Sequence, residues 1–177
     1  MVKFVWNVSE RNSAIHFKAK YFKIGHINGH FRKVYGEVIA GAHLEDPDVE
    51  LFIQASSIET MDDALDLKLK SANVLNAAEH PNMIFSAKGG CYMSSGRIWE
   101  LKGFLKFKDR IIPLTMVLSL LKRHEGFKKT MMQAQLFGRI NLKDLGIDLL
   151  SENGVSDEIE VYADVYMIKE AVATVGR

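Results

Sequence analysis

The sequence has few of the residues that would indicate catalysis or a metal site. Its one cysteine, Cys91, cannot form an internal disulfide, and its six histidines lack the spacing of a zinc motif. No serine-nucleophile elbow, phosphate-binding loop or dinucleotide fingerprint is present. We therefore expect no catalytic residue, no metal and no cofactor of the usual kinds.

Charge of one sign and long apolar runs are also scarce. The formal net charge is only +1, which gives no electrostatic basis for nucleic acid as a partner. No uninterrupted apolar run approaches the roughly 18–20 residues of a membrane span. The first residues, MVKFVWNVSE, show no basic region followed by an apolar stretch, so we expect no signal peptide and a cytoplasmic location.

What the sequence does contain is apolar and polar residues alternating with a period of two. Five stretches show this pattern, which is typical of strands with one buried and one solvated face. The chain has 177 residues, 47% of them hydrophobic, which suits a single domain over residues 1–177 with a tail frayed from about residue 170. The clearest row is formed by Ile159, Val161, Ala163, Val165 and Met167.

Only residues 61–80 change to the spacing of an amphipathic helix. Their apolar positions recur every three or four residues, so we expect one or two short helices, broken near residues 71–73. Thr60 is the expected N-cap, and Asp62 and Asp63 suit the positive end of the helix dipole.

Three segments are predicted with less regular structure or a different environment. Residues 24–29 contain two glycines and are predicted to form a turn or bulge, and residues 122–130 a polar loop. Residues 114–122 are apolar on both faces, which predicts a strand covered on both sides.

Short spacings between the strands favour antiparallel pairing, in a barrel or a sandwich. Gly36, Gly103 and Gly138 lie on the predicted inner rows, where glycine marks a bend or the close approach of a backbone or ligand. A hollow barrel and a filled one use the same types of residue, so the pattern leaves both open.

Motifs spread over nearly the whole chain resemble those of the YceI-like family of bacterial lipid-binding proteins. They begin with Trp6 to Val8 and INGHF at residues 27–31, and continue with SSIET at residues 56–60. The most specific is LKSANVLNAAEHPNMIFSA at residues 69–87. The last two are GRINLKDLGI at residues 138–147 and VSDEIEV at residues 155–161.

The resemblance implies an all-β fold with minor α content: an extended, antiparallel, lipocalin-like β-barrel of about eight strands. A short helical insertion would lie around residues 61–80. Proteins of this family hold a long-chain amphiphile along the barrel axis, typically a polyisoprenoid, and are often homodimers. No reaction is established for the fold, so the resemblance implies a protein that is not an enzyme, and no cofactor beyond a bound lipid or isoprenoid.

The resemblance and the strand rows together predict the site. The chain would bind, transport or store a polyisoprenoid, an isoprenoid quinone or a fatty-acid-like lipid, with its polar head near Lys68 and Asn73. Lys68 stands where the family often has histidine and would favour an anionic head. The predicted apolar lining consists of Ile15, Phe17, Phe31, Val38, Leu51, Ile53, Phe85, Leu101, Leu105, Leu136 and Val161.

Two other functions remain open at this stage. One is a hydrolase or isomerase acting on a lipid-like substrate in the same cavity, which would need a titratable pair inside the barrel. The predicted inner rows are almost free of such residues. The other is a filled barrel that acts as a dimeric stress or interaction protein and has no lumen.

Overall fold

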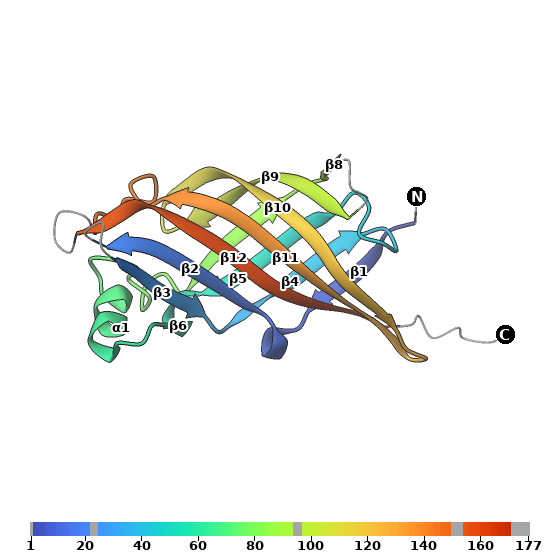
Figure 1. Ribbon diagram of the computed structural model, residues 1–177, viewed down its shortest axis with the longest axis horizontal. Helices are drawn as coiled ribbons and strands as arrows, with labels where there is room; N and C mark the ends of the chain where they lie inside the picture. Colours follow the sequence, from blue (N-terminus) through green and yellow to red (C-terminus); the bar gives the residue numbers. More distant parts are fainter. Residues whose placement is uncertain (1, 22–24, 94–96, 150–153, 171–177) are drawn as a thin grey trace.

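The computed structural model of the protein describes residues 2–21, 25–93, 97–149 and 154–170. These residues form one antiparallel sheet of twelve strands and a single α-helix, α1 (Asp63–Lys70) (Figure 1). The strands are β1 (Phe4–Val8), β2 (Ala14–Tyr21), β3 (Gly25–Phe31), β4 (Val34–Ala40), β5 (Asp48–Gln54), β6 (Ile58–Glu59), β7 (Asn82–Ala87), β8 (Cys91–Met93), β9 (Ile98–Phe107), β10 (Arg110–Glu125), β11 (Lys129–Asn141) and β12 (Val155–Glu170).

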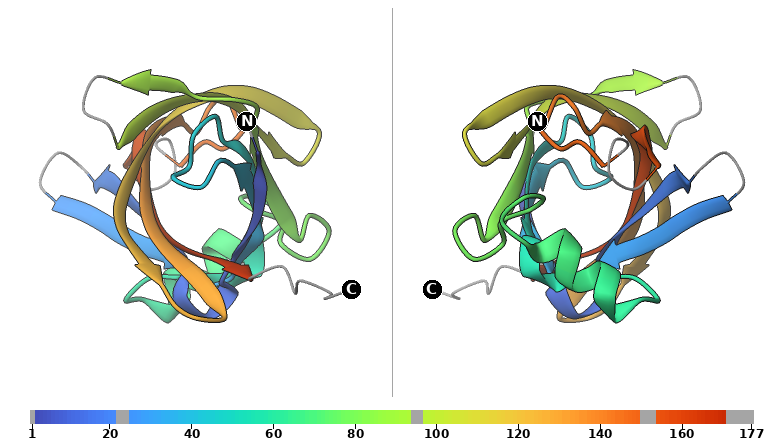
Figure 2. Two further views of the ribbon diagram at one scale, coloured as in Figure 1. Left: turned by 90° about the vertical axis from the view of Figure 1, so that its right-hand side faces the viewer. Right: turned by 90° about the vertical axis from the view of Figure 1, so that its left-hand side faces the viewer.

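Eight of these strands close into a ring. The order is β1-β4-β5-β7-β9-β10-β11-β12, and β1 pairs with β12 to complete it. Closure pairs both edges of each strand in this ring over at least part of its length. The expected barrel with a helical insertion is therefore the observed fold, and the sandwich is not (Figure 2).

The alternating rows of the sequence form the barrel interior. On β9, Trp99, Leu101, Leu105 and Phe107 are buried, whereas Phe104 on the opposite face is 56% exposed. This is the result of the pleat, which sends successive side chains to opposite faces of the sheet.

The two halves of the barrel have different walls. At residues 167–168, β12 pairs with β1, but at residues 159–164 it pairs with β2 instead. Strands β3 and β6 follow β2 in the sheet, so this half of the wall contains β2, β3 and β6. The helix α1 lies at the same end, where it crosses part of the barrel opening (Figures 1 and 2).

Residues 25–29 were predicted as a turn or bulge, and this prediction is wrong. They belong to β3, which pairs with β2 from Gly25↔Tyr21 to Phe31↔Ile15. The pairing satisfies the backbone groups, so the polar and glycine-rich sequence still forms a strand. Residue 24 lies outside the described residues.

The polar loop predicted at residues 122–130 is also wrong, because β10 and β11 continue through most of it as a hairpin. The segment is polar since most of its side chains are exposed to solvent. Residues 114–122 are not covered on both faces either: Leu114 and Met116 are buried, whereas Thr115 is exposed.

Among the residues that the structure describes, no helix has the length and apolar character needed to span a bilayer. The tail was predicted to fray from about residue 170, and residues 171–177 lie outside the described residues. Strand β12 itself continues to Glu170.

Candidate functional site

The half of the barrel next to α1 encloses a cavity of about 620 Å³. Six strands of the ring contribute to its wall, all but β1 and β4, together with β2, β3 and β6. The rest comes from α1 and from the segments that follow α1 and β11. The lining side chains are almost all aliphatic or aromatic. A volume of this size lies within the range of small-molecule sites, so the cavity is the candidate functional site.

Two aromatic rings form part of the wall built by β2 and β3. The centroids of Phe17 and Phe31 lie 5.9 Å apart, and the rings are tilted by 51°. Phe17 pairs in register with Gly29, and its ring fills the space that a Cβ atom on residue 29 would need. The glycine therefore leaves the room that the Phe17 ring occupies.

The cavity has polar groups at one end. Among the described lining residues, those with ionisable side chains are Tyr21, Asp62 and Lys68. All three are exposed, so the cavity reaches solvent beside them. We call these three residues the polar rim. The arrangement is amphipathic, with charges at the opening and an apolar interior.

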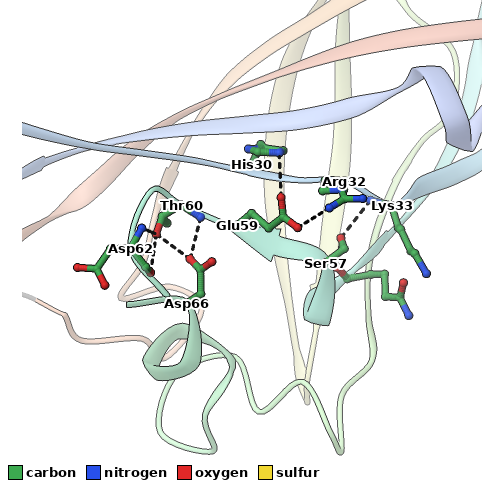
Figure 3. Close-up of polar contacts among 9 residues, drawn as sticks. His30, Arg32, Lys33, Ser57, Glu59, Thr60, Asp62 and Asp66 are labelled. Atoms are coloured by element: carbon green, nitrogen blue, oxygen red, sulfur yellow. Dashed lines mark hydrogen bonds and ion pairs between the residues drawn. The ribbon is translucent and has the colours of Figure 1, made fainter. Parts of the chain in front are cut away.

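Hydrogen bonds at the first turn of α1 cap the helix and join it to Thr60, which follows β6 (Figure 3). Asp62 is the N-cap, and its Oδ1 accepts from the backbone N–H groups of Ala64 and Leu65 at 2.9 and 3.1 Å. The predicted N-cap, Thr60, is therefore wrong by two residues. Thr60 instead donates to the buried Asp66, whose Oδ1 accepts from the Thr60 N–H and Oγ1, each at 2.7 Å.

Strand β6, which leads into α1, is held by an ion-pair cluster on the outer surface. Arg32 Nη1 lies 2.6 Å from Glu59 Oε1, and His30 Nε2 lies 3.7 Å from Glu59 Oε2 (Figure 3). These exposed contacts join Glu59 on β6 to His30 on β3 and to Arg32, which follows β3. Pairs of this kind add little stability, so their main effect is to fix position.

The segment after α1 is held by the turn between β9 and β10. Lys108 Nζ donates to the backbone carbonyl of Val74 at 2.6 Å. Burial lowers the pKa of this lysine, although Asp109 opposes the shift. Val74 and Leu75 both line the cavity, so this contact fixes part of its wall.

Beyond the cavity, the other half of the barrel is packed with side chains. Trp6, Leu44 and Leu101 are completely buried there. A void of about 10 Å³ lies between these side chains and their neighbours. The structure thus combines the two alternatives that the sequence left open, with a hollow half and a filled half.

Nine of the eleven residues predicted to form the apolar lining do line the cavity. The other two, Val38 and Leu101, point inward but are buried in the filled half. The alternation predicts which side chains face the barrel interior, but not whether they lie in the hollow half or the filled half. The nine are Ile15, Phe17, Phe31, Leu51, Ile53, Phe85, Leu105, Leu136 and Val161.

The two candidates for the head group are placed differently. Lys68 is part of the polar rim, whereas Asn73 is exposed and lies outside the lining. Asn73 follows the end of α1, where the chain turns before Val74 and Leu75 re-enter the wall. The predicted break of the helix near residues 71–73 is confirmed, since α1 ends at Lys70 with Ser71 as its C-cap.

The sequence reasoning missed the lining residues that lie outside the regular rows. Four of them lie in the segment between β11 and β12. Their signal is a set of apolar residues inside a polar, glycine-bearing stretch. These are Leu142, Leu145, Ile147 and Leu149.

A family model described as a YceI-like domain matches residues 6–167. None of the curated proteins compared with the chain matches it.

Among solved structures, BcnA from Burkholderia cenocepacia aligns with a TM-score of 0.73 at 14% identity, over 90% of this chain and 98% of BcnA. A polyisoprenoid-binding domain from Saccharophagus degradans, described as implicated in plant cell wall breakdown, aligns with a TM-score of 0.68 at 14% identity, over 95% and 99% of the two chains. A YceI protein of Campylobacter jejuni gives 0.68 at 17% identity, over 83% and 87%. At these identities the likeness shows the shared fold.

Proposed function

Since the chain belongs to the YceI-like domain family, we propose that its cavity binds a long-chain amphiphilic lipid. The apolar tail lies in the hollow half of the barrel, and the head group lies at the polar rim. The ligand class comprises polyisoprenoids, isoprenoid quinones and fatty-acid-like lipids. The protein carries or stores this ligand.

The observation that carries the proposal is the cavity of about 620 Å³ with its almost wholly apolar wall. Such a wall cannot hydrogen-bond a polar ligand, but it gains about 0.8 kcal/mol for each methylene transferred from water. A long tail therefore binds through its length. The tilted pair Phe17 and Phe31 and the flexible Met83 and Met116 provide surfaces that adapt to such a tail.

The polar rim supports an amphiphile over a simple hydrocarbon. A lysine at the opening favours a head group with negative charge, and Lys68 is placed there. The S. degradans neighbour is described as polyisoprenoid-binding, which agrees with a ligand that has a long branched tail.

We further propose that the ligand leaves unchanged, without a catalysed reaction. The ionisable lining residues within the described chain lie at the polar rim and not along the tail. The Asp62 carboxylate is already engaged as the helix cap. A hydrolase or isomerase would have to use this rim, so turnover of a prenyl ester or fatty-acid ester by the purified protein would contradict the proposal.

The test is native mass spectrometry of freshly purified protein, followed by solvent extraction and identification of what is released. We expect a stoichiometric long-chain species. The same spectrum gives the oligomeric state, for which the family resemblance predicts a homodimer. A mass that remains that of the bare protein after incubation with polyprenyl phosphates, quinones and fatty acids would overturn the proposal.

A further inference from the structure

Two residues line both the large cavity and the small void in the filled half of the barrel. They are Leu51 on β5 and Leu136 on β11. Both are almost fully buried, at 2% and 3% exposed. A side chain that borders two spaces forms part of the wall between them.

The inner rows of both strands pass through this wall in the same order. On β5, Val49 lines only the small void, Leu51 lines both spaces, and Ile53 lines only the cavity. On β11, Ala134 lines only the small void and Leu136 lines both. Farther along β11, Ile140 lines only the cavity. The boundary therefore lies at one level on each strand.

The two strands stand on opposite sides of the barrel. In the ring of eight strands, β5 and β11 are separated by four steps in either direction. Leu51 and Leu136 thus lie on facing walls of the barrel, each at the boundary between the cavity and the void. Neighbouring strands agree, since Met116 on β10 lines the cavity and Leu118, two residues later, lines the void.

The space behind this wall cannot take a lipid tail as it stands. Its volume of about 10 Å³ is close to that of one water-sized sphere, and its lining is wholly apolar. Completely buried side chains, Trp6 and Leu44 among them, fill the same half of the barrel. A tail that enters from the polar rim has to stop at the wall.

We propose that Leu51 and Leu136 set the maximum length of the tail that the cavity accepts. This inference rests on the proposed function. Affinity rises by about fourfold for each methylene until the tail reaches the two leucines. It then stops rising, because further methylenes stay in water or force the tail to fold back.

The experiment measures dissociation constants for a homologous series of saturated fatty acids, from lauric to behenic acid, by displacement of a fluorescent fatty acid. Wild type is compared with Leu136→Ala and Leu51→Ala. Each substitution truncates one of the two side chains that separate the cavity from the void. The matched control is Leu105→Ala, since Leu105 is equally buried but lines only the cavity. Thermal unfolding and circular dichroism show which variants fold, and either wall variant suffices if the other does not.

We expect the wild type to show a chain length beyond which affinity no longer rises. That length increases by two or more methylenes in a wall variant and stays unchanged in Leu105→Ala. An unchanged length in the folded wall variants, or an equal increase in the control, overturns the inference but leaves lipid binding intact. A wild type that binds no member of the series, and no isoprenoid tested beside it, overturns the proposed function and the inference together.

Discussion

Phe17 on β2 lies directly opposite Gly29 on β3, and its ring occupies the space that a Cβ atom at residue 29 would need. The backbone carbonyl of Glu59 lies on the same side, 3.0 Å from the position of that Cβ atom. The ring therefore lies over residue 29 and forms part of the cavity wall. A glycine within a strand thus has a direct effect on the shape of the site.

This relationship predicts that Gly29→Ala displaces the Phe17 ring. We expect it to lower the free energy of unfolding by about 1–3 kcal/mol, the usual cost of overpacking, and to weaken lipid binding. Gly25→Ala, on the same strand, is the matched control, because nothing lies within 4 Å of its Cβ position. Urea unfolding and lipid titration check both variants, and equal effects at the two positions would contradict the assignment.

A charge inside the cavity should abolish lipid retention. Leu105→Glu places a carboxylate among apolar lining residues, where neither water nor a counter-charge compensates it. Its neighbour Phe104 is 56% exposed on the outer face, so Phe104→Glu is the control on the same strand. We expect extracted lipid to disappear from the first variant only. Unchanged lipid in a folded Leu105→Glu would refute the lining assignment.

The head group should depend on Lys68. We expect Lys68→Met to weaken binding of a fatty acid by about tenfold, and to affect the alcohol of the same chain length less, since only the acid is charged. Lys70→Met, on the same helix but outside the lining, should leave both affinities close to wild type. Equal losses for acid and alcohol would show that Lys68 acts by packing alone.

The buried Asp66 should determine how firmly α1 is fixed. Asp66→Ala removes the carboxylate that accepts two 2.7 Å hydrogen bonds from Thr60. The backbone N–H and the hydroxyl of Thr60 both lose this acceptor. We expect a loss of about 1–3 kcal/mol and faster amide hydrogen exchange in α1. Asp63→Ala, at an exposed position in the same turn, should cost at most about 1 kcal/mol through the helix dipole. Wild-type exchange rates in Asp66→Ala would show that the helix is held by other contacts.

Asp48 predicts a pH dependence of stability at the filled end. A hydrogen bond from the Gly89 N–H at 2.9 Å, together with Lys3, lowers the pKa of this carboxyl below its ordinary value, although partial burial opposes the shift. Because the folded pKa lies below the unfolded one, the stabilisation is complete above about pH 4 and is lost as the pH falls through the folded pKa.

The destabilisation caused by Asp48→Asn should therefore be largest near neutral pH and shrink in acid. Thermal unfolding of wild type and variant from neutral pH to pH 3 checks this. A difference in melting temperature that does not change with pH would assign the effect to packing.

Several features of the protein follow from its sequence alone. The period-two rows predict which side chains face inward, because the pleat leaves no other choice once one face is buried. They correctly placed Leu105 inside and Phe104 outside. The change of spacing after residue 60 predicted α1, since a period of three to four residues fits a helix and not a strand.

Other features were decided only by tertiary pairing. Residues 25–29 have the composition of a turn, yet they form a strand because β2 offers a complete ladder beside them. The N-cap of α1 moved from Thr60 to Asp62 because the Thr60 hydroxyl is used by the buried Asp66. The local sequence pattern predicts neither the pairing of β3 with β2 nor the hydrogen bond between Thr60 and Asp66.

The level at which the lumen changes from hollow to filled is also a tertiary property. Val38 and Ile53 are equally apolar and inward-facing, yet one lies in the filled half and the other lines the cavity. The two residues differ in the strands around them. In the filled half β12 pairs with β1, whereas around the cavity it pairs with β2, which is followed by β3 and β6. The sequence determined the inner face of each strand because that depends on local geometry, whereas the free volume depends on how far apart the strands stand.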